Sequence, residues 1–267
     1  MRNILFILSF LALAACEREE FNPKLGGYNK NLLVIEGLIT TSPDIQRMQI
    51  TRTSNYMDGL EIKSVENATV TITCENSNYE FTHSDKGIYL PPAGFIAEIG
   101  KTYKLSVMVD GQNYEAESTV SQPLALDSLS SERDEFEDDC FRVKGWFLDN
   151  AAKDEHFLFK YAVNDVMVDT LTKWSTYSDM LTNNVRFENV DLFYGVEANE
   201  RDKVTVYTFS ISKKYYNFIN DAQKNLQPPI PFNPSPGIRI KGNISNGALG
   251  FFQASAVTQK SARLKKY

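Results

Sequence analysis

Hydrophobic and polar residues alternate along much of residues 31–122, and this pattern is typical of β-strands that bury one face. In the clearest run, four small or apolar side chains alternate with three threonines. The side chains that the pattern places on the buried face are those of Ala68, Val70, Ile72 and Cys74. Short alternating runs at this spacing predict a β-sandwich over residues 31–122.

A hairpin is predicted within the same region. Residues 103–109 and residues 114–120 both alternate, and Asp110-Gly111 lies between them. An Asp-Gly pair between two alternating runs favours a tight turn, because such turns require positive φ.

Residues 123–267 are predicted to form a second β-rich domain. Gln122-Pro123 and the polar stretch from Asp127 to Asp139 mark the boundary, and we interpret the acidic part of that stretch as a solvated linker. The runs that resemble strands are Phe141–Leu148, Phe157–Val163, Val166–Leu171, Val204–Ile211 and a closing strand over Ala248–Val257.

One helix interrupts the β pattern of this second domain. Its apolar residues recur at helical spacing, and Pro228-Pro229 end it. We interpret this stripe as core packing rather than as a ligand site. The proline-rich segment that follows is predicted to be a fixed loop, with a polyproline ligand as the alternative. The residues of the stripe are Tyr215, Phe218, Ile219, Ala222 and Leu226.

The N-terminus has the layout of a secretory signal. Residues 1–15 combine a positive start at Arg2 with an apolar run that ends in small residues. This run is too short to cross a bilayer, because a spanning helix needs about 20 residues. It ends in Leu13-Ala14-Ala15-Cys16, which resembles the lipobox of bacterial lipoproteins, where the cysteine is lipidated and the chain is cut before it.

Cys16 is therefore the predicted lipidation site and the predicted first residue of the mature protein. Two or three acyl chains such as palmitate would anchor the chain stably to a membrane that it does not span. Residues 16–30 are polar and contain glycine, so we interpret them as the lipidated tether. Ordinary secretion, with Cys16 as an unmodified thiol, is the alternative.

Charge and cysteine content narrow the class of protein. The chain has 28 basic and 34 acidic residues, and only Arg2 lies in the signal, so the mature net charge is 27 minus 34, or −7. This balance argues against nucleic acid as a partner, because phosphate backbones require a basic patch.

Cys74 and Cys140 could pair in an exported protein, but we expect Cys74 to be a buried thiol on the apolar face of its strand.

The sequence contains no recognisable catalytic or metal-binding motif. His83 and His156 are its two histidines, and neither lies in a metal-binding helical motif. We predict that neither is catalytic, that no metal or cofactor is bound, and that the protein is not an enzyme. Aromatic residues gather in the second half, and exposed ones would suit stacking on a sugar or packing on a partner protein. They are Trp146, Trp174, Tyr177, Phe193, Tyr194, Tyr215 and Tyr216.

Several motifs together resemble one known family. In the first domain they are Ala68-x-Val70-x-Ile72, Gly87-x-Tyr89, Gly100-x-x-Tyr103-x-Leu105 and Asp110-Gly111-x-x-Tyr114. Near the C-terminus they are Gly242-Asn243-Ile244 and Gly247-Ala248-Leu249-Gly250-Phe251-Phe252-x-Ala254-Ser255. With the lipobox, these motifs are similar to those of a family of Bacteroidetes outer-membrane lipoproteins, domain of unknown function 4249. The resemblance covers nearly the whole mature chain.

The resemblance implies an all-β fold, with an immunoglobulin-like or prealbumin-like sandwich followed by a second β-rich domain with one short helix. It also implies an outer-membrane location facing outside, and an accessory role beside a TonB-dependent nutrient receptor. It carries over no catalytic residue. We therefore expect a surface-exposed lipoprotein that binds a ligand or a receptor without catalysis. Whether the ligand is a small molecule or a glycan stays open.

Two alternatives belong to other functional classes. A structural or adhesive surface module is one, because sandwiches commonly serve in that role. A hydrolase is the other, because two carboxylates can meet in space from anywhere in the chain. No motif selects such a pair.

Overall fold

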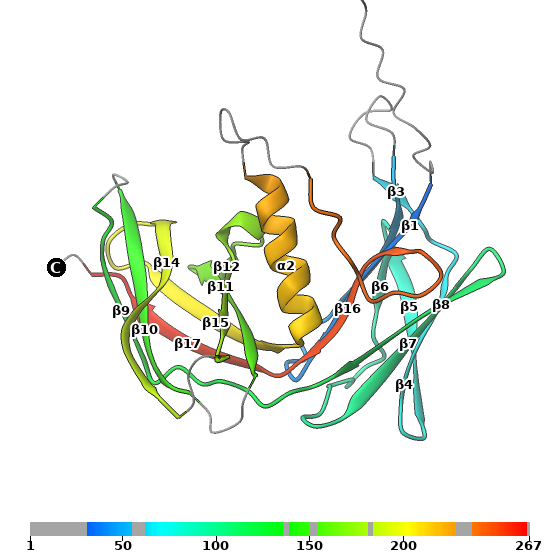
Figure 1. Ribbon diagram of the computed structural model, residues 1–267, viewed down its shortest axis with the longest axis horizontal. Helices are drawn as coiled ribbons and strands as arrows, with labels where there is room; N and C mark the ends of the chain where they lie inside the picture. The colour runs from blue at the N-terminus through cyan, green and yellow to red at the C-terminus, as the bar shows by residue number, and fades with distance from the viewer. Residues whose placement is uncertain are drawn as a thin grey trace, which may run out of the picture. The chain divides into compact units, whose positions relative to one another are not determined.

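Figure 1 shows the fold of the computed structural model, which describes residues 31–54, 62–135, 139–149, 154–180, 184–227 and 237–265. Strands make up 55% of the structure and helices 8%, which confirms the prediction of an all-β fold with one short helix. The predicted signal over residues 1–15, the tether over residues 16–30 and Cys16 itself lie outside the described residues.

The first sheet has nine strands. Its order is β16-β1-β2-β6-β5-β4-β7-β8, and β3 pairs with β2 beside this path. The strands are β1 (Leu33–Thr40), β2 (Arg47–Arg52), β3 (Lys63–Ser64), β4 (Thr69–Cys74), β5 (Ser77–Asp85), β6 (Ile88–Leu90), β7 (Thr102–Val109), β8 (Gln112–Thr119) and β16 (Leu249–Ser255).

Two sequence predictions about this sheet are confirmed. β4 buries Val70, Ile72 and Cys74, while its threonines stay more exposed. β7 and β8 form an antiparallel hairpin around Asp110 and Gly111, whose φ angles are 52° and 77°. The buried face of β4 and the turn at Asp110-Gly111 could therefore be predicted from the sequence, because each depends on residues only a few positions apart.

β16 comes from far along the chain and completes this sheet. It pairs in parallel with β1, whereas β1 pairs with β2 in the antiparallel sense. On its other side, the backbone N–H of Ala254 donates a hydrogen bond to Ser118 Oγ of β8 at 2.9 Å. The sheet is thereby nearly barrel-like. Phe252 of β16 is fully buried within the core that the sheet encloses.

The segment before β16 folds back closely onto the strand. The Asn243 side chain bonds both the N–H and the carbonyl of Phe252, each at 2.8 Å. A Cβ atom on Gly242 would lie 2.0 Å from the carbonyl oxygen of Gly250, so only glycine fits at this position. These contacts give a physical reason for Gly242, Asn243 and Gly250 in the C-terminal motif.

Two further sheets share a second core. One has three strands in the order β14-β10-β9, and the other has five, with β12-β11-β15-β17 in a row and β13 beside β11. Buried side chains of both sheets, such as Phe147 and Phe159, pack into one cluster. The strands are β9 (Ser128–Arg133), β10 (Cys140–Leu148), β11 (His156–Val163), β12 (Val166–Met167), β13 (Ser175–Ser178), β14 (Arg186–Glu197), β15 (Lys203–Ile211) and β17 (Val257–Arg263).

The predicted helix is confirmed as α2 (Lys213–Leu226), which packs against β11 of the five-stranded sheet (Figure 1). Ser212 caps it, because its Oγ accepts a hydrogen bond from the N–H of Tyr215 at 3.2 Å. Ile219 and Ala222 of the predicted stripe are buried, whereas Leu226 in the last turn is exposed.

Several strand predictions are wrong in their bounds. The predicted strand Val166–Leu171 contains only the two residues of β12, and Leu171 begins the short 3-10 helix η2 (Leu171–Lys173). The predicted closing strand is divided at Ala256 between β16 and β17, which belong to different sheets. The polar stretch that marks the predicted boundary contains β9, and β13 and β14 were not predicted.

The pairing of β16 concerns the predicted division of the chain into two domains. It lies within residues 123–267, the predicted second domain, yet it pairs with β1 of the predicted first domain over residues 31–122. By its internal contacts, Asn31–Tyr267 forms one compact unit. The domain boundary near residue 122 stays a prediction. Within the described part of the chain, no helix combines the length and apolar character needed to cross a membrane.

Candidate functional site

A cavity of about 530 Å³, here called the aromatic cleft, lies between α2, the adjacent face of β11 and β15, the chain around β1 and β2, and β16. Cavities of roughly 300–1,000 Å³ suit small ligands. The apolar lining is formed by Leu38, Ile45, Met167, Leu171, Trp174, Phe209, Tyr215, Phe218, Ile219 and Phe251. The polar lining is formed by Glu36, Asp44, Gln46, Arg47, Lys160 and Asp169.

Three aromatic rings form one wall of the aromatic cleft. Tyr215 and Phe218, three residues apart on α2, are stacked with centroids 5.9 Å apart. Phe251 of β16 lies 4.9 Å from the Tyr215 ring and 5.3 Å from the Phe218 ring. Such a wall offers ring faces to a ligand, and aromatic contacts add about 0.5–1.5 kcal/mol beyond the area they bury.

Lys160 is the buried charge of the aromatic cleft. It lies in β11, a strand whose other residues are almost all buried, and 10% of its side chain is exposed. Its Nζ lies 2.9 Å from Asp169 Oδ1 and 3.5 Å from the centroid of the Trp174 ring. Burial lowers the pKa of the Lys160 ammonium, although the hydrogen bond and charge of Asp169 oppose that shift.

Asp169 is shared by two cations. Its Oδ1 accepts the hydrogen bond from Lys160, and its Oδ2 accepts one from Arg47 of β2 at 3.1 Å. Arg47 and Asp169 are both substantially exposed, so water screens their pair. The three groups therefore carry one uncompensated positive charge. The carboxylates of Glu36 and Asp44, which also line the cleft, are exposed to solvent.

Trp174 is held in place by α2. The Gln223 side chain of the helix donates hydrogen bonds to the carbonyls of Leu171 and Trp174, both at 2.9 Å. The indole Nε1 is buried without a hydrogen-bond partner among the described residues. The indole ring is thus positioned by its backbone and by packing, with one face towards Lys160.

Tyr215 is a second titratable group of the aromatic cleft. Burial raises the pKa of its hydroxyl well above the usual range, and the negative charges of Glu36 and Asp169 add to this shift. The hydroxyl therefore stays neutral at physiological pH, where it can both donate and accept a hydrogen bond.

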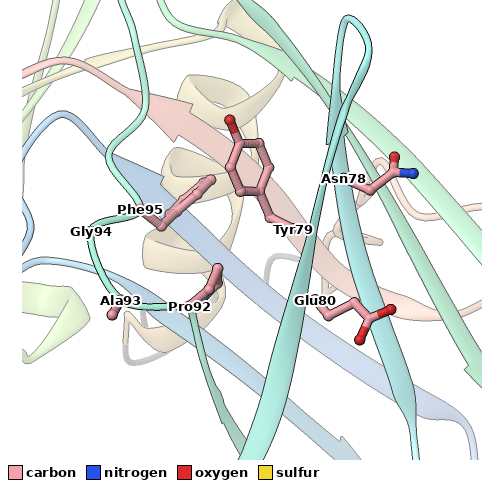
Figure 2. Close-up of a pocket in the computed structure, with 7 residues that line it drawn as sticks. All are labelled: Asn78, Tyr79, Glu80, Pro92, Ala93, Gly94 and Phe95. Carbon is pink, nitrogen blue, oxygen red and sulfur yellow. The ribbon is translucent and has the colours of Figure 1, made fainter.

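A second cavity, of about 430 Å³, lies between β5 and the loop before β7. Figure 2 shows that Tyr79 and Phe95 face each other there, while Asn78 and Glu80 point away from them. The two rings meet edge to face with centroids 4.8 Å apart. This cavity has an apolar corner but no buried charge in its lining, so we consider it a weaker candidate.

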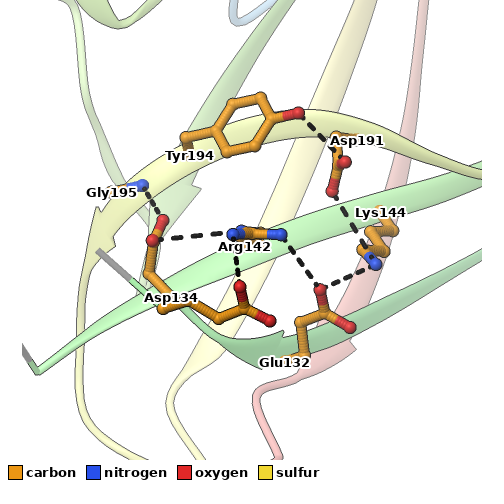
Figure 3. A network of polar contacts seen from close by, with 8 residues as sticks. Glu132, Asp134, Arg142, Lys144, Asp191, Tyr194 and Gly195 are labelled. Atoms are coloured by element: carbon orange, nitrogen blue, oxygen red, sulfur yellow. Dashed lines mark hydrogen bonds and ion pairs between the residues drawn. The ribbon is translucent and has the colours of Figure 1, made fainter. Parts of the chain in front are cut away.

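A network of charged side chains covers the face of the three-stranded sheet that points away from the second core (Figure 3). Arg142 of β10 lies within 3.9 Å of the carboxylates of Glu132, Asp134 and Glu135. The Asp134 side chain is 2% exposed, and its Oδ2 accepts a hydrogen bond from the N–H of Gly195 at 3.1 Å. The interpretation as a solvated linker is therefore wrong for Glu132 and Asp134, whereas Glu135 and Asp139 are exposed and residues 136–138 lie outside the described residues.

The same network continues to β14. Lys144 lies 2.7 Å from Glu132 and 3.9 Å from Asp191, and its hydrogen bond to Glu132 raises the pKa of the ammonium. Tyr194 donates a hydrogen bond to Asp191 at 3.0 Å, and its ring lies 5.5 Å from the Arg142 guanidinium. Because opposite charges alternate and bind each other, we interpret this network as one that joins three strands rather than as a ligand site.

The cysteines and histidines within the described residues lie in strands. Cys74 is a buried free thiol in the first core, as expected, and Cys140 is buried at the start of β10. His83 lies within β5, with its ring 5.3 Å from the Tyr89 ring. His156 is buried at the start of β11, with its ring 4.9 Å from the Tyr216 ring. Among the residues described, His, Cys, Asp and Glu form no group of three that could hold a metal.

The predicted aromatic group is divided by the fold. Trp174 and Tyr215 line the aromatic cleft, Phe193 lies in the second core, and Tyr194 lies exposed on the charged network. Lys160 was not predicted as a site residue, although a lysine inside the apolar run of residues 157–163 was a usable signal. A charged residue within a run that otherwise predicts a strand buried on both faces is costly unless it is paired.

Comparison with protein families identifies the chain. The family described as Domain of unknown function (DUF4249) matches residues 18–261. The protein belongs to this family. The match includes every residue that lines the aromatic cleft, so the cleft is built from residues of the family domain. No curated protein matches the DUF4249 chain in a sequence search.

Proposed function

We propose that this DUF4249 protein is a lipid-anchored, non-catalytic binding protein of the outer membrane that faces outside. Its ligand is held in the aromatic cleft. The observation that carries this proposal is a cavity of about 530 Å³ that combines aromatic walls with one buried, fixed cation. Ligand sites are commonly apolar cavities with a few converging polar groups.

The chemistry of the aromatic cleft favours binding over catalysis. Lys160 and Asp169 already hold each other in an ion pair, and Arg47 binds the remaining oxygen of that carboxylate. We therefore assign these charged groups a role in orienting a bound molecule.

The anchoring part of the proposal rests on Cys16 at the end of the lipobox. Replacing Cys16 with Ser is expected to move the protein from the membrane fraction to the soluble fraction, because the acyl chains would be lost. Cys74→Ala is the matched control, since it removes a thiol outside the lipobox. Retention of the Cys16→Ser variant on the membrane, or a mature N-terminus without added acyl mass, would contradict the anchor.

The proposed partner is a TonB-dependent outer-membrane receptor, as the family resemblance implies. Affinity purification of the lipidated protein from detergent-solubilised membranes is expected to recover one β-barrel receptor reproducibly. Purification of the untagged strain provides the background. Repeated recovery of the protein alone would contradict the proposed receptor, and this result would not bear on the proposed ligand-binding cleft.

A dye titration tests the aromatic cleft as the binding site. Anilinonaphthalene sulfonate, which fluoresces when it leaves water, is added to the full-length Cys16→Ser protein. We expect one saturable site, and we expect Ile45→Trp to abolish it by filling the cleft that Ile45 lines. Val166→Trp adds the same side chain at an exposed position and should leave binding unchanged. Undiminished binding by the Ile45→Trp variant would refute the site.

A further inference from the structure

Lys160 has unused hydrogen-bonding capacity inside the aromatic cleft. An ammonium group carries three N–H donors. Among the described residues, Asp169 Oδ1 is the one hydrogen-bond acceptor of Lys160 Nζ, and the Trp174 ring covers another side of the group at 3.5 Å. The Phe209 ring also lies 5.7 Å from Nζ. The side chain is 10% exposed and lines the cavity, so an acceptor in the cleft that reaches Nζ takes up a remaining N–H donor.

We propose that the aromatic cleft recognises an amphipathic anion, whose oxyanion head accepts a hydrogen bond from Lys160 while its apolar body lies on Tyr215, Phe218 and Phe251. This inference rests on the proposed function of the cleft and adds the chemical class of its ligand. Aromatic or other apolar carboxylates and sulfonates belong to that class. Such a ligand satisfies the open donors and covers the ring faces at the same time.

The net charge of the lining does not select an anion, because Glu36, Asp44 and Asp169 outnumber Arg47 and Lys160, so the proposed preference depends on direct contact of the head group with Lys160. Lys160 and Arg47 share a single carboxylate, that of Asp169, so one positive charge is left over. Glu36 and Asp44 oppose an anion, but both are exposed, and water and salt screen exposed charges more strongly than buried ones.

Paired dyes test this class of ligand. Anilinonaphthalene sulfonate and phenylnaphthylamine share their ring system, but only the first carries an anionic head. We expect the full-length Cys16→Ser protein to bind the sulfonate at least about 10-fold more tightly than the neutral dye. A hydrogen bond to a charged group corresponds to a change of about 10- to 100-fold in affinity.

Substitution of Lys160 then assigns this preference to one side chain. Lys160→Met keeps an apolar side chain of similar length, and Asp169 keeps its partner Arg47, so we expect the fold to be retained. The variant should bind the sulfonate about 10- to 100-fold more weakly and the neutral dye with unchanged affinity. Lys214→Met, on the exposed face of α2, makes the same change in net charge and should affect neither dye.

The two proposals fail in distinguishable ways. If Ile45→Trp abolishes the binding of both dyes, the cleft is a binding site. Its preference for an anion is refuted if wild-type protein binds both dyes equally, or if Lys160→Met weakens the binding of both dyes equally. The wild-type comparison needs no variant, so it decides the question even if Lys160→Met does not fold. If Ile45→Trp binds both dyes like wild type, the cleft itself is not the site.

Discussion

Tyr103 illustrates how a single buried hydroxyl couples this fold to pH. The residue is buried in the first core, and its hydroxyl accepts a hydrogen bond from the N–H of Glu98 at 2.8 Å. Burial raises the pKa of Tyr103 from 10.0 to about 12, the hydrogen bond from the Glu98 N–H opposes that shift, and Cys74 and the charge of Glu98 add smaller raising effects. Between these two pH values the folded state holds the proton that the unfolded state has released, so the free energy of unfolding falls as pH rises.

Tyr103→Phe is therefore expected to reduce the alkaline loss of stability. The stabilising contribution of the hydroxyl proton is fully present below about pH 10 and is lost towards about pH 12 in the wild type only. At neutral pH the variant should be about 1 kcal/mol less stable, because Glu98 loses its acceptor. Urea unfolding at a series of alkaline pH values measures both effects. Parallel pH curves for the two proteins would exclude Tyr103 as the titrating group.

At Gly242 the fold is constrained by the close approach of two backbone segments rather than by charge. Gly242→Ala would place a Cβ atom 2.0 Å from the backbone oxygen of Gly250, so the backbone must shift. We expect the free energy of unfolding to decrease by about 1–3 kcal/mol. Gly237→Ala is the control, because a Cβ atom at Gly237 meets nothing within 4 Å. Equal effects of the two substitutions in chemical denaturation would mean that this close approach does not limit the fold.

At the scale of elements, the position of α2 depends on Ser212, the residue that caps it. Ser212 Oγ accepts a hydrogen bond from the N–H of Tyr215 and donates one to Gln253 Oε1 of β16 at 2.9 Å. One side chain therefore caps the helix and fastens it to the strand that carries Phe251. Tyr215 and Phe218 follow within the first turns, so this cap also positions the wall of the aromatic cleft.

Ser212→Ala is expected to lower the free energy of unfolding by about 1–2 kcal/mol, because a helix cap and an inter-element hydrogen bond are lost together. The affinity for anilinonaphthalene sulfonate should fall as well, since the aromatic wall is less well fixed. Ser84→Ala, at an exposed position in β5, is the control. Thermal unfolding and dye titration provide the two measurements, and an unchanged dye affinity would separate the cap from the cleft.

The regularity of each strand explains whether the sequence pattern could predict it. β4 and β7 alternate without interruption, so their buried faces could be assigned from residue order. β14 pairs with β10 through several register shifts, and Asn189 and Gly195 within it have positive φ. Each irregularity moves the following side chains to the other face, which destroys the period of two. β14 could therefore not be recognised by alternation.

At the scale of the whole molecule, β16 and β17 connect the two cores. β16 contributes Phe252 to the core of the nine-stranded sheet, and β17 follows directly and pairs with β15. Ala256, between the two strands, is buried and hydrogen bonded to Ser210 of β15. The connection is short and tightly held, so unfolding of one sheet should disturb the other.

Phe252→Ala tests this coupling. Removing a fully buried ring is expected to lower stability by about 3–5 kcal/mol. Trp146 lies in β10 of the three-stranded sheet, whereas Trp174 lines the aromatic cleft beside residues of the nine-stranded sheet, so the measurement uses a Trp174→Phe background in which Trp146 alone reports on the second core. We expect the fluorescence midpoint in urea to shift with the midpoint measured by far-UV circular dichroism.

The exposed position Leu90 supplies the control, since Leu90→Ala should shift neither midpoint. If Phe252→Ala leaves the fluorescence midpoint unchanged while circular dichroism shows earlier unfolding, the two regions unfold independently. That outcome would favour the predicted division into residues 31–122 and 123–267 over a single cooperative unit.

The amino-acid sequence by itself determined the local features of this protein. The buried face of β4, the turn at Asp110-Gly111 and the bounds of α2 each follow from residues within a few positions of one another. Only the tertiary structure decided that β16 pairs with β1, and that Lys160 meets Trp174 and the Asp169–Arg47 pair. The physical reason is that periodicity and capping act through neighbours in the chain, whereas the partner of a strand or of a buried charge is selected by the packing of distant segments.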